Sequence, residues 1–296
     1  MLKYTVIFFL FCCTACSSKI PSPVDSITEQ NIIRDVTWLA SDALQGRHYR
    51  SVEARKAANY IASAWKEAGL TPLPSRNSMY LPTADLRDSP NVAAIYKGTG
   101  DTFVCITAHY DHLKPKRSGD DRIYNGADDN ASGVAALISI GNALSKVTSK
   151  LESSIVLIAF TGEEAGFVGS KHFANNSPIA LNKIRGLLNL DMISRGEPNT
   201  IFLEGAPDAP RINMAIVRAN AQIDLHIIRN AHPDWLYRSD QAPFIEKNVP
   251  AVFFSVEDHE DYHRVSDHAD KILPGLATKT TQLVFLTAID LARPVP

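Results

Sequence analysis

The sequence Ser154-Ile-Val-Leu-Ile-Ala-Phe160, followed directly by Thr161-Gly-Glu-Glu-Ala-Gly166, decides how the chain folds. Its first half is a short apolar run rich in β-branched residues, which is typical of a buried strand. Its second half is a turn bounded by glycines that carries two acids. Ligands of open α/β sheets bind beyond the carboxyl ends of the strands, so Glu163 and Glu164 stand where a site is expected.

Similar apolar runs alternate with helix-like segments along the rest of the chain. We expect strands at residues 91–97, 102–108, 154–160, 185–190, 200–203, 225–228 and 251–256. Helical periodicity is found at residues 51–70, 131–145 and 274–292. The alternation predicts the α/β class, with a sheet covered by helices on both faces.

Composition and charge narrow the possible functions. The chain has 296 residues, of which 45% are hydrophobic and 21% charged, enough for the core of one large domain. We place this domain at residues 27–296. The formal net charge is -2 and both signs are interleaved, so no broad basic face is available for a phosphate backbone. Nucleic acid is therefore not expected as a partner.

The first residues are typical of an export signal. Lys3 precedes an apolar stretch at residues 6–13, which is too short to span a bilayer as a helix. We expect a signal peptide at residues 1–15 and a polar tether at residues 16–26. This signal predicts export from a bacterial cell.

Cys16 resembles the cysteine of a bacterial lipoprotein signal, which becomes the lipidated first residue of the mature chain. Cys13 departs from that signal, in which this position is usually Leu. We expect a lipid anchor at Cys16, at the outer membrane facing the periplasm, with simple cleavage and secretion as the alternative. Of the four cysteines only Cys105 lies within the domain, where we expect it to be a core residue without a disulfide.

His109 follows directly on the strand expected at residues 102–108, which places it at the carboxyl end of the sheet. Asp111, two residues on, is placed to hold the imidazole, because a metal-ligating histidine usually donates its other ring N–H to a carboxylate or carbonyl. No strand directs His112, and we expect that side chain at the rim or in solvent.

The segment Asn125-Gly-Ala-Asp-Asp-Asn-Ala-Ser-Gly133 is a polar turn that runs into an apolar helix. Its adjacent acids, Asp128 and Asp129, concentrate negative charge at a cost that bound cations would remove. Capping of the helix by Asp129 or Asn130 is a sound alternative, although it explains Asp128 less well.

Asp191 ends the apolar run Leu187-Leu-Asn-Leu-Asp-Met192. A carboxylate directly after so apolar a strand needs a partner, since burying a bare charge is costly. The partner is either a metal or, alternatively, Arg185 or Arg195 in a buried salt bridge.

The run at residues 251–256 leads into a segment that holds His259 and His263, and spacing alone does not choose between them. Two imidazoles and three carboxylates suit a pair of zinc ions, with one carboxylate bridging them and a further one free to move a proton. We assign Glu164 to metal and Glu163 to proton transfer.

These residues resemble those of peptidase family M28, the co-catalytic zinc aminopeptidases of the bacterial leucyl aminopeptidase type. The elements His-x-Asp, Gly-Ala-Asp-Asp-Asn-Ala-Ser-Gly, Gly-Glu-Glu, Asn-Leu-Asp-Met and Asp-Tyr-His occur in family order, and the likeness runs from Leu39 through Asp267. It implies the zinc exopeptidase fold, a three-layer sandwich with a mixed, mostly parallel central sheet.

The resemblance also implies the roles of the site residues. It makes His109 and Asp191 ligands of one zinc, Glu164 and His263 ligands of the other, and Asp128 the bridge. It makes Glu163 the general base, with Asp111 orienting His109, and implies a cis peptide between Asp128 and Asp129. Two departures, Gln241 in place of His and Arg264-Val265 in place of Thr-Pro, are expected at the substrate rim and bear on specificity.

The implied activity is that of an aminopeptidase, which hydrolyses N-terminal residues of peptides through a metal-bridging hydroxide with Glu163 as the base. Three alternatives stay open. A glutaminyl-peptide cyclotransferase of related fold would use a single zinc, a carboxypeptidase or dipeptidase would hold a different part of the peptide, and a binding protein on the same fold would lack catalysis.

Overall fold

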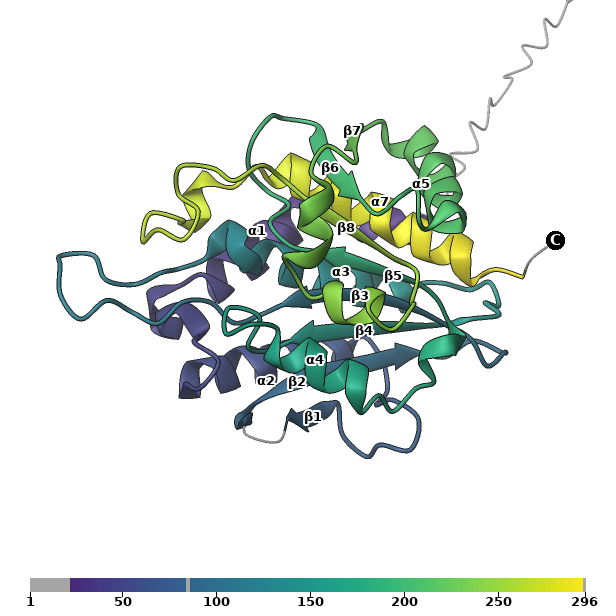
Figure 1. The fold of residues 1–296 in the computed structure, drawn as a ribbon, viewed down its shortest axis with the longest axis horizontal. Helices are drawn as coiled ribbons and strands as arrows, with labels where there is room; N and C mark the ends of the chain where they lie inside the picture. The colour runs from purple at the N-terminus through teal and green to yellow at the C-terminus, as the bar shows by residue number, and fades with distance from the viewer. Residues whose placement is uncertain (1–21, 84–85, 295–296) are drawn as a thin grey trace, which may run out of the picture.

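The computed structural model describes residues 22–83 and 86–294. In this part of the chain eight strands form one sheet, in the order β1-β2-β4-β3-β5-β8-β6-β7 (Figure 1). The strands are β1 (Tyr80–Thr83), β2 (Leu86–Tyr96), β3 (Phe103–His109), β4 (Ser154–Phe160), β5 (Ile184–Leu190), β6 (Thr200–Glu204), β7 (His226–Arg229) and β8 (Ala251–Ser255).

The sheet is mixed, with a parallel centre. The pairs β3/β4, β3/β5, β5/β8 and β6/β7 are parallel, whereas β1/β2, β2/β4 and β6/β8 are antiparallel. The central strands are mostly apolar because both of their faces are covered. The predicted mixed, mostly parallel sheet is confirmed.

Helices cover both faces of the sheet. They are α1 (Glu29–Leu39), α2 (Val52–Glu67), α3 (Gly133–Leu144), α4 (Val168–Asn175), α5 (Pro210–Ile223), α6 (Ala242–Ile245) and α7 (Pro274–Ala292). Figure 1 shows α4 on the near side of the sheet and α2 and α3 on its far side. The buried side chains of α1, α2, α3, α5 and α7 belong to one hydrophobic cluster, and those of α4 and α6 to another.

The two clusters are the two cores of a three-layer sandwich. In the smaller one, Phe160 from β4 meets Phe173 from α4 and Phe244 from α6, each pair with ring centroids 6.0 Å apart. Cys105 is fully buried beside them and is free, as expected of a core residue. The three-layer prediction is therefore confirmed.

The predicted signal peptide and Cys16 lie outside the described residues, as does most of the predicted tether. Its last residues, Pro23–Ser26, form a short 3₁₀ helix in which Val24 packs against the larger core. None of the helices among the described residues combines the length and the apolar character needed to cross a bilayer.

Candidate metal centre

Three neighbouring parallel strands end at one edge of the sheet, and the predicted site residues follow them. β3 ends at His109, β4 ends just before the turn that carries Glu163, and β5 ends just before Asp191. The register pairs His109 with Phe160 across β3 and β4. Side chains far apart in the sequence therefore converge beyond this edge.

His109 is the buried centre of a first cluster. Its Nε2 lies 3.1 Å from Oδ1 of Asp191 and 3.2 Å from Oδ1 of Asp129. Its Nδ1 lies 3.1 Å from the backbone carbonyl oxygen of Asp111 and 3.9 Å from the Asp111 carboxylate. If Nδ1–H donates to this carbonyl, Nε2 keeps a lone pair directed between the two other carboxylates, as a metal ligand requires.

Asp129 joins this cluster to a second one. Whereas its Oδ1 faces His109, its Oδ2 lies 3.1 Å from Nε2 of His263. The same Nε2 lies 3.2 Å from Oε2 of Glu164. The structure thus brings His109, Asp191, Glu164 and His263 together, with Asp129 between the two pairs.

The structure does not place Asp128 between the two pairs, as the expected bridging role requires. Its Oδ1 accepts hydrogen bonds from the backbone N–H and the hydroxyl of Ser194, both at 2.7 Å. Its Oδ2 lies 3.2 Å from Nε2 of His259. The cis peptide was also misplaced by one residue, because it joins Asp129 to Asn130.

Asp267 sets the direction of the two adjacent acids. This buried carboxylate accepts the backbone N–H of Asp128 at 3.0 Å and that of Asp129 at 3.1 Å. The turn at Ala127–Ser132 is irregular, with Asp129 and Asn130 outside helical backbone angles. The two side chains leave this turn toward different partners, so Asp129 and not Asp128 faces His109.

His112 is also placed differently from the expectation. We expected it at the rim or in solvent, but its side chain is fully buried. Its Nδ1 lies 2.7 Å from Oε1 of Glu164 and 3.6 Å from Oδ2 of Asp129. The loop that follows His112 returns at Gly126 and covers the ring, a contact that local sequence does not reveal.

Glu163 and Asp111 lie beside the clusters. The backbone N–H of Glu163 donates to Oδ1 of Asp111 at 3.1 Å, which ties the acidic turn after β4 to the segment after β3. The Glu163 side chain is half-buried and contributes to neither candidate group of metal ligands found among the described residues. It therefore stays available for proton transfer, and this role remains a prediction.

The charges of the site shift the pKa values of its members. Burial and the carboxylates of Asp191, Asp240 and Glu164 together raise the pKa of Glu163 well above its ordinary value, against the opposing charge of His109. Burial alone would also raise the pKa of Asp129, but His112, His109 and His263 outweigh it and hold that pKa well below its ordinary value. The site is thus a buried set of acids that needs positive charge.

Asp191 accepts a hydrogen bond from a network of buried polar side chains. The Ser239 hydroxyl donates to its Oδ2 at 2.7 Å. Asn189 donates to the Ser239 hydroxyl at 3.0 Å and to Oε1 of Gln241 at 2.7 Å. Gln241 is fully buried, so the expectation that it touches the substrate rim is wrong.

Arg185 and Arg195, the alternative partners of Asp191, pair elsewhere. Arg185 binds Glu152 at 2.9 Å and Arg195 binds Asp261 at 2.8 Å. A salt bridge with either arginine therefore does not explain why an acid, Asp191, follows β5.

The donor sets of both clusters fit zinc. One ligand atom each from His109, Asp129 and Asp191 lie within 4.8 Å of one another, and so do those of a group made of His112, Asp129 and Glu164. Imidazole nitrogens and carboxylate oxygens are common zinc ligands, and cations would offset the repulsion among the buried acids. The two groups share Asp129, as two adjacent metal positions would.

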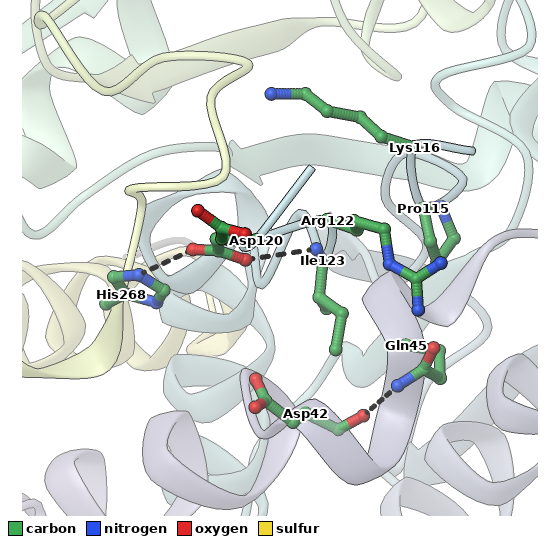
Figure 2. Close-up of a pocket in the computed structure, with 9 residues that line it drawn as sticks. Asp42, Gln45, Pro115, Lys116, Asp120, Arg122, Ile123 and His268 are labelled. Carbon is green, nitrogen blue, oxygen red and sulfur yellow. Dashed lines mark hydrogen bonds and ion pairs between the residues drawn. The ribbon is translucent and has the colours of Figure 1, made fainter. Parts of the chain in front are cut away.

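Two surface pockets are formed by segments that adjoin the clusters. One, of about 430 Å³, is formed by the loop after His112, the 3₁₀ segment at Asp42–Arg47 and His268. Figure 2 shows residues that line it, among them Asp42, Gln45 and His268. The Ile123 N–H donates to Asp121, and His268 lies 3.5 Å from the carboxylate of that residue. None of the residues that line it belongs to the candidate metal ligands.

The other pocket opens directly beside Asp191 and has a volume of about 40 Å³. Its lining residues are Asp191, Met192, Trp235, Arg238, Phe253, Ser255, Asp258 and Tyr262. Half of these residues, Met192, Trp235, Phe253 and Tyr262, are apolar or aromatic, which suits the side chain of a bound ligand. Arg238 and Asp258 pair at 3.3 Å, and the Arg238 guanidinium lies 5.8 Å from the centre of the Trp235 ring.

The model of Peptidase family M28 matches residues 91–288, more than half of the chain. The chain belongs to peptidase family M28. Its matched residues contain both candidate clusters. The resemblance inferred from the motifs is therefore confirmed at the level of the family.

Individual relatives of this M28 chain agree with that placement. It is 30% identical over 190 residues to a probable zinc metalloprotease of Pyrenophora teres f. teres, covering 60% of this chain and 35% of that protein. The chain spans between 28% and 58% of the length of the first curated relatives.

Two solved structures show the same fold. The LapA aminopeptidase of Legionella pneumophila superposes with a TM-score of 0.76 at 19% identity, over 93% of this chain and 74% of that one. The glutaminyl cyclase of Porphyromonas gingivalis gives a TM-score of 0.71 at 18% identity, over 88% and 97%. The zinc exopeptidase architecture of the M28 chain is thus shared with enzymes of different activities.

Proposed function

We propose that this M28 chain is a zinc-dependent aminopeptidase. The observation that carries the proposal is the position of Asp129, whose Oδ1 faces His109 and whose Oδ2 faces His263. One carboxylate directed at two separate ligand pairs, with Glu163 left over beside them, is the arrangement that a two-metal hydrolase needs.

His109, Asp129 and Asp191 would hold one zinc, and Asp129, Glu164 and His263 the other. When bound, the zinc ions would supply Lewis acidity that polarises the scissile carbonyl and makes a water more acidic. Glu163 would take the proton from that water and give it to the departing amine.

The charges around the site favour the amino end of the peptide. A carboxypeptidase needs a cationic or bidentate donor for the substrate carboxylate, a task for which arginine is suited. Arg238 is the one base among the residues that line the pocket beside Asp191, and it is paired with Asp258. A substrate ammonium group meets an excess of carboxylates here, which attract it.

The alternative activities make different demands. A cyclotransferase of related fold would use a single zinc, whereas here Asp129 lies between two donor pairs, His109 with Asp191 and His263 with Glu164. A binding protein has no need of a free acid beside the ligands, and Glu163 is present. Peptide hydrolysis accounts for both features.

The test compares two classes of substrate on the purified full chain. We expect hydrolysis of amino-acid p-nitroanilides, loss of activity with a chelator and its return with zinc. N-acetylated forms of the same substrates should resist cleavage. Hydrolysis of the blocked substrates alone, or conversion of N-terminal glutamine to pyroglutamate without hydrolysis, would contradict the proposal.

A further inference from the structure

His112 is enclosed more fully than His263, the other histidine that contacts Glu164. Its side chain is fully buried, whereas that of His263 is 37% exposed. The two rings meet edge to face, with centroids 5.8 Å apart. The ring of Tyr124 approaches the edge of His112 on another side, with centroids 6.4 Å apart. His112 is therefore enclosed between the site and the loop that follows it.

Gly126 fixes the position of the His112 ring. Its backbone has a φ of +58°, and a Cβ at this position would lie 2.6 Å from Cδ2 of His112. Only glycine permits both this backbone angle and this close approach. The ring is thus seated against the turn that leads to Asp129, and its orientation is set before any cation binds.

The two oxygens of Glu164 have different partners. Oε1 lies 2.7 Å from Nδ1 of His112, and Oε2 lies 3.2 Å from Nε2 of His263. His263 Nε2 also approaches Asp129, so His263, Asp129 and Oε2 of Glu164 surround one point. His112 instead contacts Oε1, the other oxygen of Glu164, and its Nδ1 lies 3.6 Å from Oδ2 of Asp129.

The contact between His112 and Glu164 determines which ring nitrogen of His112 carries the proton. An ionised carboxylate only accepts hydrogen bonds, and Nδ1 of His112 lies 2.7 Å from Oε1 of Glu164. Nδ1 must then donate. Nε2 is buried without a partner among the described residues. Nε2 is thus unsatisfied in either tautomer, so the 2.7 Å contact between Nδ1 and Glu164 is what places the proton.

We infer that His112 is a positioning residue of the second metal position: its Nδ1–H holds Oε1 of Glu164 and leaves Oε2 directed at the point shared with His263 and Asp129. The inference rests on the metal centre of the proposed function, and not on the reaction that the centre catalyses. A hydrogen-bonded partner of this kind orients a ligand without touching the metal.

The test is a calorimetric zinc titration of the metal-free full chain and three variants. His112→Ala removes the donor, and we expect the affinity of one of the two zinc sites to fall about 10- to 100-fold while the other changes little. His112→Asn places an amide N–H where Nδ1 stands and should restore most of the loss. His112→Gln places its amide near the position of Nε2 and should not.

His268→Asn is the matched control. His268 also faces an acid, Asp121 at 3.5 Å, but it is 40% exposed and lies at the surface pocket of Figure 2. Both zinc affinities should stay at the wild-type values in this variant.

Cobalt substitution separates a donor from a ligand. If His112 is a donor, the visible absorption bands of the cobalt-loaded His112→Asn variant match those of the wild type, because the coordinating atoms are unchanged. A shifted spectrum in this variant, or unchanged zinc affinities in His112→Ala, would overturn the inference. If His112→Ala fails to fold, the contrast between Asn and Gln decides. If the wild-type chain binds two zinc ions but hydrolyses no peptide, the proposed function is wrong, whereas this inference still holds.

Discussion

Asp128 and Asp129 are adjacent in the chain, but their carboxylates serve different parts of the molecule. Asp128 binds Ser194 at 2.7 Å, inside the fold. Asp129 lies 3.2 Å from Nε2 of His109 and 3.1 Å from Nε2 of His263. This divergence favours the second acid as the metal ligand and gives the first a structural hydrogen bond.

Substitution of each acid by its amide separates the two roles. Asp129→Asn should lower the affinity of both zinc sites by at least about 100-fold, because it removes a charge that both share. Asp128→Asn should keep two zinc ions per chain and lose about 1–3 kcal/mol of stability through its buried hydrogen bonds. Metal analysis and urea unfolding measure the two effects. Loss of zinc in the Asp128 variant alone would reverse the assignment.

Glu163 tests the proton-transfer role. Glu163→Gln removes the base but keeps the size of the side chain, and we expect kcat to fall about 10²- to 10⁴-fold. Both zinc ions should stay bound, because Glu163 belongs to neither ligand group. Steady-state kinetics on zinc-loaded protein measure the loss, and near-normal turnover with two zinc ions bound would show that another group moves the proton.

Substitution of Arg47 tests how the N-terminal segment stabilises the loops around the site. This fully buried side chain donates to the backbone carbonyls of Leu39, Tyr110, Asn125 and Gly126. Burial lowers its pKa to about 10, which leaves it charged at neutral pH. Arg47→Met leaves these carbonyls without their donor, and the loss in unfolding free energy should reach about 3 kcal/mol or more.

Urea unfolding measures this loss. Arg211→Met, at an exposed position near the start of α5, is the control and should change stability by less than about 0.5 kcal/mol. Equal effects of the two substitutions would mean that the buried network around Arg47 contributes nothing specific.

Arg238 tests the pocket beside Asp191. With about 40 Å³, the pocket holds roughly three water-sized groups, so we expect small apolar side chains to be preferred over phenylalanine. Arg238→Ala removes part of the rim and should raise the ratio of kcat/KM for phenylalanine over alanine p-nitroanilide by about tenfold or more.

The matched control for this test is Arg218→Ala. Arg218 is also an exposed arginine paired with an acid, Asp290 at 2.5 Å, but it lies on α5. The ratio should not change in that variant. An unchanged ratio in Arg238→Ala would show that Arg238 does not limit the pocket.

The strands and their ends were predictable because they depend on local pattern. β4 and α7 have the expected bounds of residues 154–160 and 274–292. A polar residue that directly follows an apolar run, as His109 and Asp191 do, lies at the carboxyl edge of a parallel sheet wherever the strand pairs. Most of the site follows from this rule.

The remaining details depend on contacts between distant segments. Which of two adjacent acids faces His109 is decided by Asp267, more than a hundred residues away in the sequence. His112 is buried because the loop after it returns at Gly126, and Gln241 because Asn189 holds it. Helices α1 and α5 were not predicted, although Ile32, Val36 and Leu39 bury one face of α1.

The most direct test of the two-metal account is anomalous scattering at the zinc edge from a crystal of the zinc-loaded chain. We predict two peaks about 3.5 Å apart, both in contact with Asp129, one beside His109 and Asp191 and the other beside Glu164 and His263. A single peak, or two peaks with Asp129 bound to neither and Asp128 between them, would contradict the account.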